Sequence, residues 1–103
     1  MRSREPVSLR RLLPTASFVG CADIRVAGAT EHADQCVPGT LFAALASDEA
    51  IAAHAIRNGA SALLVSRPLV GMPVSQCIVP EVAPALGEIC AALAERNRYP
   101  AGD

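Results

Sequence analysis

Two short, wholly apolar runs on either side of a helix-forming stretch constrain the fold of this chain most strongly. Leu41–Leu45 and Ala62–Val65 each have the composition of a strand that is buried on both faces of a sheet. The stretch between them can begin at a helix cap, Ser47 or Asp48, and ends at Gly59. Strand, helix and strand within about 25 residues predict a parallel βαβ unit with a right-handed crossover.

The periodicity of apolar residues predicts the remaining elements. The βαβ helix should turn Ile51, Ala55 and Ile56 toward the sheet. The spacing of apolar residues in the last third of the chain, through Ile89 and Leu93, predicts its longest helix. The other expected elements are a short helix at Ser8–Leu13, strands at Phe18–Cys21, Ile24–Ala29 and Ser75–Val79, a loop at Arg67–Pro73 and the long helix at Glu81–Arg98.

The length and the shortage of aromatic residues set the fold class. A chain of 103 residues with three aromatic side chains makes about one domain, whose core is built from Ala, Val, Leu and Ile. We therefore predict an α/β fold with a small mixed or mostly parallel sheet, a βαβ unit and about three helices. Residues 1–103 form the single domain, in which 1–6 are a flexible lead-in and 99–103 the end of a linker.

Lysine is absent, and all nine basic residues are arginine. A phosphate-binding loop of the G-x-x-x-x-G-K-[ST] type and Schiff-base catalysis both need lysine, so neither is available to this chain. The G-x-G-x-x-G and G-x-S-x-G motifs are also missing. With a net charge of −1, the chain has no excess of basic residues that would favour binding of nucleic acid. No apolar run is long enough to span a membrane. We expect a monomer with neither kind of partner.

The four cysteines are widely spaced, and their number alone does not decide between an oxidising and a reducing compartment. A disulfide framework or a zinc site is possible by number, but small buried thiols in a reducing cytoplasm fit the spacing better. Cys77 in an apolar run and Cys90 beside the stripe of the long helix support burial. Pro14 interrupts the apolar stretch that follows the basic N-terminus, which argues against a signal peptide. We predict a cytoplasmic protein.

The two histidines are the side chains that titrate nearest to neutral pH. His54 falls on the polar side of the βαβ helix, so we expect it on the surface. His32 lies in a polar segment with Glu31 and Asp34 close by. An acid–base or metal role is conceivable for that group, since loops after strands carry many sites, but a solvated loop is the simpler interpretation. A small independent enzyme that uses His32 with Asp34 is the least favoured of the functions that we consider.

An ordered set of motifs resembles the amino-terminal domain of the Mur ligases. Val37-Pro38-Gly39-Thr40-Leu41-Phe42-Ala43-Ala44-Leu45 is similar to the V-x-P-G-x-L-F-x-A-L segment typical of that family. Ala55-Ile56-Arg57-Asn58-Gly59-Ala60-Ser61-Ala62-Leu63-Leu64-Val65 and the step Val79-Pro80-Glu81 follow in the same order. The similarity covers about Leu9 to Arg98. It looks most like the type that adds the third residue to the peptidoglycan stem peptide, a UDP-N-acetylmuramoyl-tripeptide synthetase.

The resemblance implies a function that a lysine-free domain could perform. In that family this domain holds the uridine diphosphate end of a UDP-N-acetylmuramoyl-peptide, while the central domain carries the ATP-binding P-loop. The resemblance therefore implies a domain that is not catalytic by itself, within an ATP-dependent ligase. It needs no cofactor of its own, since ATP and Mg²⁺ would belong to the central domain, and its partners would be that domain and the nucleotide-linked peptide.

The sequence departs from the family where the nucleotide should bind. The positions of the family's D-S-R segment hold His32, Ala33 and Asp34, which removes a hydroxyl and reverses a charge. A shorter stretch, Ala46 to Glu49, stands in place of a longer polar loop. These changes favour an alternative, a non-catalytic structural or interaction module that keeps the fold but has lost nucleotide binding. By position alone, the predicted substrate-binding residues are Glu31, His32, Ala33, Ser47 and Asp48, with no catalytic residue and no metal ligand.

Overall fold

Five strands form one sheet, in the order β2–β7–β6–β5–β4, in a computed structural model that describes residues 6–46 and 48–96. The four strands from β7 to β4 are parallel to one another, and β2 joins the edge antiparallel to β7. The sheet strands are β2 (Ser17–Val19), β4 (Gly28–Thr30), β5 (Thr40–Ala43), β6 (Ala62–Val65) and β7 (Ser75–Ile78). The predicted α/β class with a mostly parallel sheet is confirmed.

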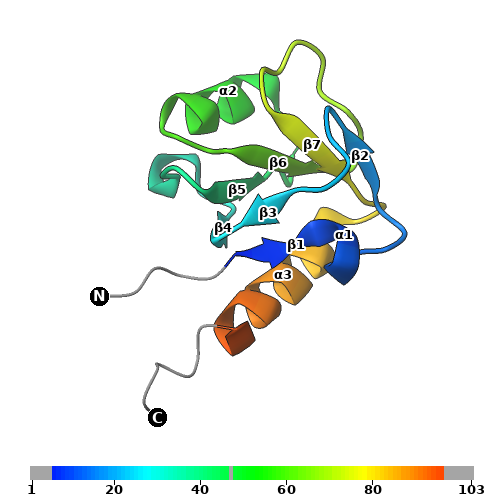
Figure 1. The fold of residues 1–103 in the computed structure, drawn as a ribbon. Helices are drawn as coiled ribbons and strands as arrows, with labels where there is room; N and C mark the ends of the chain where they lie inside the picture. The colour runs from blue at the N-terminus through cyan, green and yellow to red at the C-terminus, as the bar shows by residue number, and fades with distance from the viewer. Residues whose placement is uncertain (1–5, 47, 97–103) are drawn as a thin grey trace.

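Helices cover both faces of this sheet, as Figure 1 shows. The helix α2 (Glu49–Arg57) lies on one face together with η1 (Ala33–Gln35), a short 3₁₀ turn. On the other face lie α3 (Val82–Arg96), α1 (Leu9–Leu12) and a small antiparallel ribbon. The ribbon pairs β1 (Val7–Ser8) with β3 (Arg25–Val26). Three layers with two cores result.

The βαβ prediction is confirmed by the register. In β5 and β6, Leu41 lies beside Ala62, Phe42 beside Leu63, and Ala43 beside Leu64. Because side chains alternate across a strand, each of these runs fills both cores. The Leu41 and Leu64 side chains pack in the core on the α3 side, and Phe42 and Leu63 pack in the core on the α2 side. This double burial explains why Leu41–Ala44 and Ala62–Val65 are apolar, whereas Leu45, which was predicted to be buried with them, lies beyond β5 and is 50% exposed.

Three expectations from the sequence are wrong in detail. The run Ile24–Ala29 is not one strand, since β3 pairs with β1 and β4 joins the main sheet. In α2 the buried residues are Ala52 and Ala55, while Ile51 is 45% exposed. Small alanines let α2 approach the sheet closely and leave Ile51 at its margin. Cys90 is exposed on α3, where Ala85 and Ile89 are buried instead.

Other expectations hold. His54 is exposed on α2, and that helix ends at Arg57 with Asn58 as its C-cap, followed by Gly59 with φ of +120°. The connection 66–74 contains no helix or strand. Most of the expected lead-in 1–6 and all of the expected linker 99–103 lie outside the described residues; Pro6, the one described, is exposed.

Candidate functional site

The carboxyl ends of β4 and β5 open onto a small hollow of about 120 Å³. In open α/β sheets, ligands bind at this edge of the strands. The hollow lies where β4 leads toward η1 and β5 leads toward α2. The residues that line it are Glu31, Phe42, Ala43, Ala44, Leu45, Ala46, Asp48 and Ile51.

Local hydrogen bonds bring the two acidic residues to the hollow. After β4, the Thr30 hydroxyl accepts a hydrogen bond from the backbone N–H of His32 at 3.1 Å, which turns the chain at Glu31. After β5, the N–H of Ala44 still donates to the carbonyl of Leu64 at 2.9 Å, and the chain then bends toward Asp48. Glu31 thus follows directly on β4, whereas Asp48 lies five positions beyond the end of β5, at the start of α2.

The first amides of α2 are occupied by the side chain of Asp48. Its Oδ1 accepts hydrogen bonds from the N–H groups of Ala50 at 2.8 Å and Ile51 at 3.2 Å. These are the free amides that a helix start would otherwise offer to an anion. Asp48 is thus the cap that the sequence analysis expected, and its negative charge interacts favourably with the helix dipole.

The charge of the hollow is negative. Glu31 and Asp48 both line it, and within residues 6–46 and 48–96 no lysine, arginine or histidine does so. A phosphate brought close to either carboxylate would be repelled by about 1 kcal/mol per charge pair at 4 Å in water. The apolar side chains of Leu45 and Ile51, which are 50% and 45% exposed, form the remaining wall. The hollow therefore suits an uncharged ring or sugar better than a bare diphosphate.

The other predicted site residues lie apart from the hollow. His32 is exposed, with its Nε2 3.7 Å from a carboxylate oxygen of Glu31, and in the described part of the chain no ion pair joins it to Asp34. Ala33 is buried in the core on the α2 side, and its carbonyl accepts a hydrogen bond from the Asn58 amide at 3.0 Å. Ser47 lies outside the described residues. The structure therefore brings together Glu31 and Asp48, but not His32 or Ala33.

Part of the motif that carried the resemblance lies at the opposite edge of the sheet, away from the hollow. The N–H of Gly39 donates to the Ser61 hydroxyl at 2.8 Å, and the N–H of Ser61 donates to the Thr40 carbonyl at 2.8 Å. A Cβ at Gly59 would stand 2.9 Å from the ring of Pro38. These contacts join the start of β5 to the end of α2. This part of the motif therefore secures the fold, while its continuation, Phe42–Leu45, lines the hollow.

Two wider grooves were not anticipated from the sequence. One, of about 460 Å³, lies between β1, α1 and the end of α3; its lining includes Ser8, Arg11, Ala92 and Arg96. The other, of about 300 Å³, lies between the α1–β2 connection and the start of α3. Each depends on segments distant in the sequence, and the first on a two-residue strand, so no local pattern could have indicated them.

The thiols of Cys36 and Cys77 are buried, and the potential metal ligands of the described residues do not cluster. Within residues 6–46 and 48–96, no group of three or more His, Cys, Asp and Glu residues could hold a metal ion. Burial raises the pKa of the Cys36 thiol, and the nearby Asp34 carboxylate adds to the shift. Burial also raises the pKa of the Cys77 thiol to about 11. In the described part of the chain, no helix has the length and apolar character needed to cross a membrane.

Comparison of structures finds the same fold within much longer proteins. Crystal structure II of MurF from Acinetobacter baumannii matches 91% of this chain with a TM-score of 0.66 and 21% sequence identity. Crystal structure I of that MurF matches 82% with a TM-score of 0.63 and 20% identity. A structure of UDP-N-acetylmuramoylalanyl-D-glutamyl-2,6-diaminopimelate--D-alanyl-D-alanyl ligase from the same organism gives the same TM-score, identity and coverage.

These matches establish the fold alone. The chain spans about a fifth of the length of each of these proteins, from 20% to 22%. No family model matches the sequence. No curated protein matches it either.

Proposed function

We propose that this chain is the first domain of a Mur-type peptide ligase and positions the UDP part of a UDP-N-acetylmuramoyl-peptide in peptidoglycan precursor synthesis. The observation that carries the proposal is the likeness of fold to MurF over 82–91% of the chain, with a hollow at the carboxyl edge of the parallel strands. The domain is not catalytic by itself. A central domain supplies ATP, Mg²⁺ and the chemistry, and the whole ligase works in the cytoplasm.

The hollow limits which part of the nucleotide the domain can hold. Its apolar wall of Leu45 and Ile51 can pack against a uracil ring, and its carboxylates can accept hydrogen bonds from ribose hydroxyls. The diphosphate then lies at the mouth of the hollow, where the two carboxylates repel it and a basic group of another domain would neutralise it. The third-residue type of ligase, which the motif order suggests, remains part of this proposal; the structural matches are MurF proteins.

Titration of the chain with a UDP-sugar tests the proposal. Chemical-shift changes are expected at the backbone amides of Glu31, Ala44 and Ala46 at millimolar UDP-N-acetylglucosamine. Uridine alone should shift the same amides. No change at millimolar ligand, or changes confined to another face, would contradict nucleotide binding by this chain.

Variants that each remove one carboxylate from the hollow test whether the shifts come from binding at this site. Glu31→Gln removes one carboxylate from the hollow, and Asp48→Asn removes the other while keeping an oxygen to cap α2. Each should tighten UDP-sugar binding by up to about fivefold, because one close repulsion of about 1 kcal/mol is relieved. Glu88→Gln is the matched control, since Glu88 lines a different groove.

A second candidate function rests on Asp48, the N-cap of α2. Because Asp48 already occupies the amides of Ala50 and Ile51, the domain can be a structural or interaction module without a nucleotide. It then folds stably alone, and neither charge variant restores binding of UDP-sugar. The same titration separates the two candidates.

A further inference from the structure

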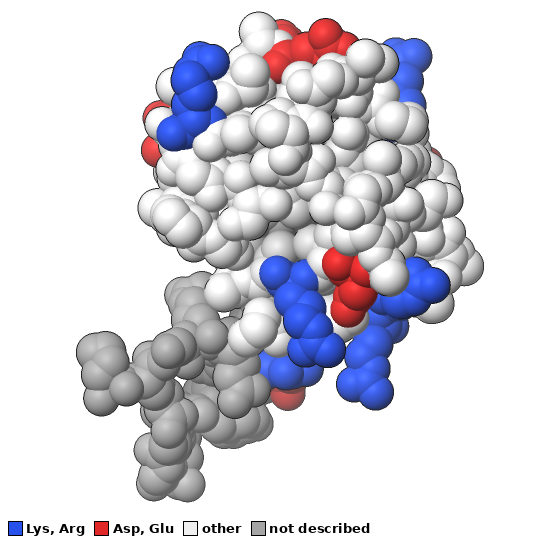
Figure 2. Space-filling model, turned by 45° about the horizontal axis from the view of Figure 1, so that its top comes forward, with Lys and Arg blue, Asp and Glu red and all other residues white. Residues whose placement is uncertain are grey.

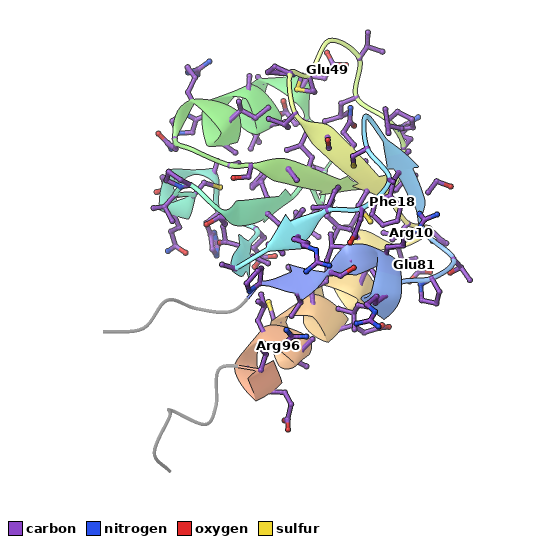
Figure 3. The ribbon with its side chains drawn as sticks, viewed as in Figure 1. Arg10, Phe18, Glu49, Glu81 and Arg96 are labelled. Atoms are coloured by element: carbon purple, nitrogen blue, oxygen red, sulfur yellow. The ribbon has the colours of Figure 1, made fainter. Side chains whose placement is uncertain are left out.

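The groove at the start of α3 has an apolar floor and an acidic rim. Its floor includes Leu13 and Val79, which belong to the core, and the prolines Pro80 and Pro84. Glu81 and Glu88, both exposed, stand on its α3 side. Figure 3 shows Glu81 at the end of α3 that adjoins α1. This groove is separate from the hollow between β4 and β5, with which it shares no lining residue.

The two carboxylates face the groove without a basic partner. Neither Glu81 nor Glu88 forms an ion pair with any residue that the structure describes, and no lysine, arginine or histidine lines the groove. Arg10, labelled in the same region of Figure 3, is engaged elsewhere. Its guanidinium donates to the carbonyl of Ala22 at 2.9 Å and lies 5.8 Å from the centre of the Phe18 ring.

The spacing of the carboxylates defines what would match them. Glu88 lies seven positions after Glu81, which directly precedes α3, so the two residues lie on one side of the helix, about 10 Å apart along its axis. A polyproline II segment repeats every three residues with a rise of about 3.1 Å, which places residues i and i+3 on one side about 9 Å apart. Two basic residues at that spacing can each reach one carboxylate, and the two residues between them can contact the floor.

We propose that this groove binds an extended basic segment of a partner polypeptide, of the form Arg-x-x-Arg with apolar residues between the arginines. The charge complementarity with Glu81 and Glu88 selects this occupant, and the apolar floor accommodates its centre. On the face that Figure 2 draws, charged side chains stand at the upper margins and in a mixed group of basic and acidic side chains in the lower part. The site is independent of the proposed nucleotide function.

Peptide titration of the 103-residue chain tests this inference. The probe is the acetylated and amidated peptide Arg-Pro-Leu-Arg, and the control peptide is Gln-Pro-Leu-Gln. Shifts of the amides of Leu13, Ala16 and Ala85 are expected with the arginine peptide, weaker at high salt and absent with the glutamine peptide. Equal binding of both peptides, or no shift at these amides at millimolar peptide, would overturn the inference.

Variants separate a true site from a general charge effect. Glu81→Gln and Glu88→Gln should each weaken peptide binding about two- to fivefold, the range for one exposed ion pair. In the double variant the loss should be roughly the product of the two single losses. Glu31→Gln removes the same charge outside the groove and should leave peptide binding unchanged. Thr15→Arg places a cation in the groove and should abolish binding without touching α3.

Two results would decide against the inference. If Glu31→Gln and Glu81→Gln weakened peptide binding equally, the weakening would come from the net charge of the chain and not from the groove. Concentration-dependent shifts at the groove in the absence of peptide would instead identify a second copy of the chain as the occupant.

Discussion

The side-chain amide of Gln76 holds the backbone of Leu69 through two hydrogen bonds. The Leu69 N–H donates to Oε1 at 2.8 Å, and Nε2 donates to the Leu69 carbonyl at 2.9 Å. Gln76 is 4% exposed, so this pairing is shielded from water. It ties the connection 66–74 to β7 and seats Leu69 in the core on the α2 side. A buried polar side chain thus replaces regular secondary structure in ordering this connection.

Replacing Gln76 should destabilise the fold strongly. Gln76→Met keeps the approximate size of the side chain but leaves the Leu69 N–H and carbonyl without partners. Each unsatisfied buried group costs about 1–3 kcal/mol, so we expect a loss of about 2–4 kcal/mol in the free energy of unfolding. Urea unfolding measures it. Gln35→Met is the control, because Gln35 is exposed. A difference between the two variants below about 0.5 kcal/mol would contradict the assignment.

Gln76 also shows why sequence reasoning reached only part of the structure. The runs that become β5 and β6 were recognisable because burial on both faces excludes polar residues. A single glutamine in β7 has the pattern of a solvent-facing position, and its partner seven residues away cannot be read from the sequence. The run Ile24–Ala29 misled because alternation looks the same in one strand and in two fragments that join different sheets.

The residues of the candidate site were predicted by their positions relative to the family motif, and whether they bind a substrate stays a prediction. Two of them, Glu31 and Asp48, line the hollow at the ends of β4 and β5. Ala33 was included by its position in a motif, yet the turn of η1 directs it into the core. Whether a residue in such a turn faces the core or the hollow depends on tertiary packing against α2, to which no local pattern is sensitive.

Gly59 should not tolerate a side chain. Its φ is +120°, and an added Cβ would lie 2.9 Å from Pro38 Cδ and 3.0 Å from the Val37 carbonyl carbon. Gly59→Ala therefore combines backbone strain with a clash against a rigid ring, and we expect a loss of about 2–4 kcal/mol in the free energy of unfolding. Gly71→Ala is the control: its φ is +77°, but nothing lies within 4 Å. It should cost about 1–2 kcal/mol. A smaller loss at Gly59 than at Gly71 would refute the proposed contact.

Asp23 should make stability depend on pH in the acid range. Its pKa is lowered chiefly by the hydrogen bond from the Ser8 hydroxyl at 2.6 Å, assisted by the N–H groups of Arg10 and Ile24 and by the charge of Arg25. A carboxyl whose pKa is lower in the folded state contributes stability above its unfolded pKa of about 3.9. That contribution is lost as the pH falls through the folded pKa.

Comparison of the wild type with Asp23→Ala measures this contribution. The difference between their free energies of unfolding should be largest near pH 7 and should shrink below about pH 4, as Asp23 is protonated. Asp34→Ala removes an exposed carboxylate and corrects for the general effect of losing one acid. A difference that stays constant from pH 7 to pH 3 would show that the Ser8 hydrogen bond does not favour the charged form.

The four thiols should differ widely in their reactivity. Cys90 is exposed on α3, Cys21 is partly exposed, and Cys36 and Cys77 are buried. A pKa of about 11 against the ordinary 9.0 lowers the thiolate fraction of Cys77 about a hundredfold at pH 8. Burial also blocks access of the reagent, so Cys77 can react only when the fold opens. A short pulse of iodoacetamide should therefore label Cys90 first, and mass spectrometry of the peptides will show the order.

Thiol variants identify the reacting groups. Cys90→Ser should remove the fast phase, whereas Cys77→Ser should leave it intact, and in urea all four cysteines should react alike. All four cysteines are free thiols in this structure. The disulfide framework that the sequence left as an alternative predicts a different result, in which the cysteines are labelled only after reduction. Rapid labelling of Cys77 in the native state would place it outside the core and would contradict the packing of β7 against α3, because that face of the strand cannot be both in the core and accessible to the reagent.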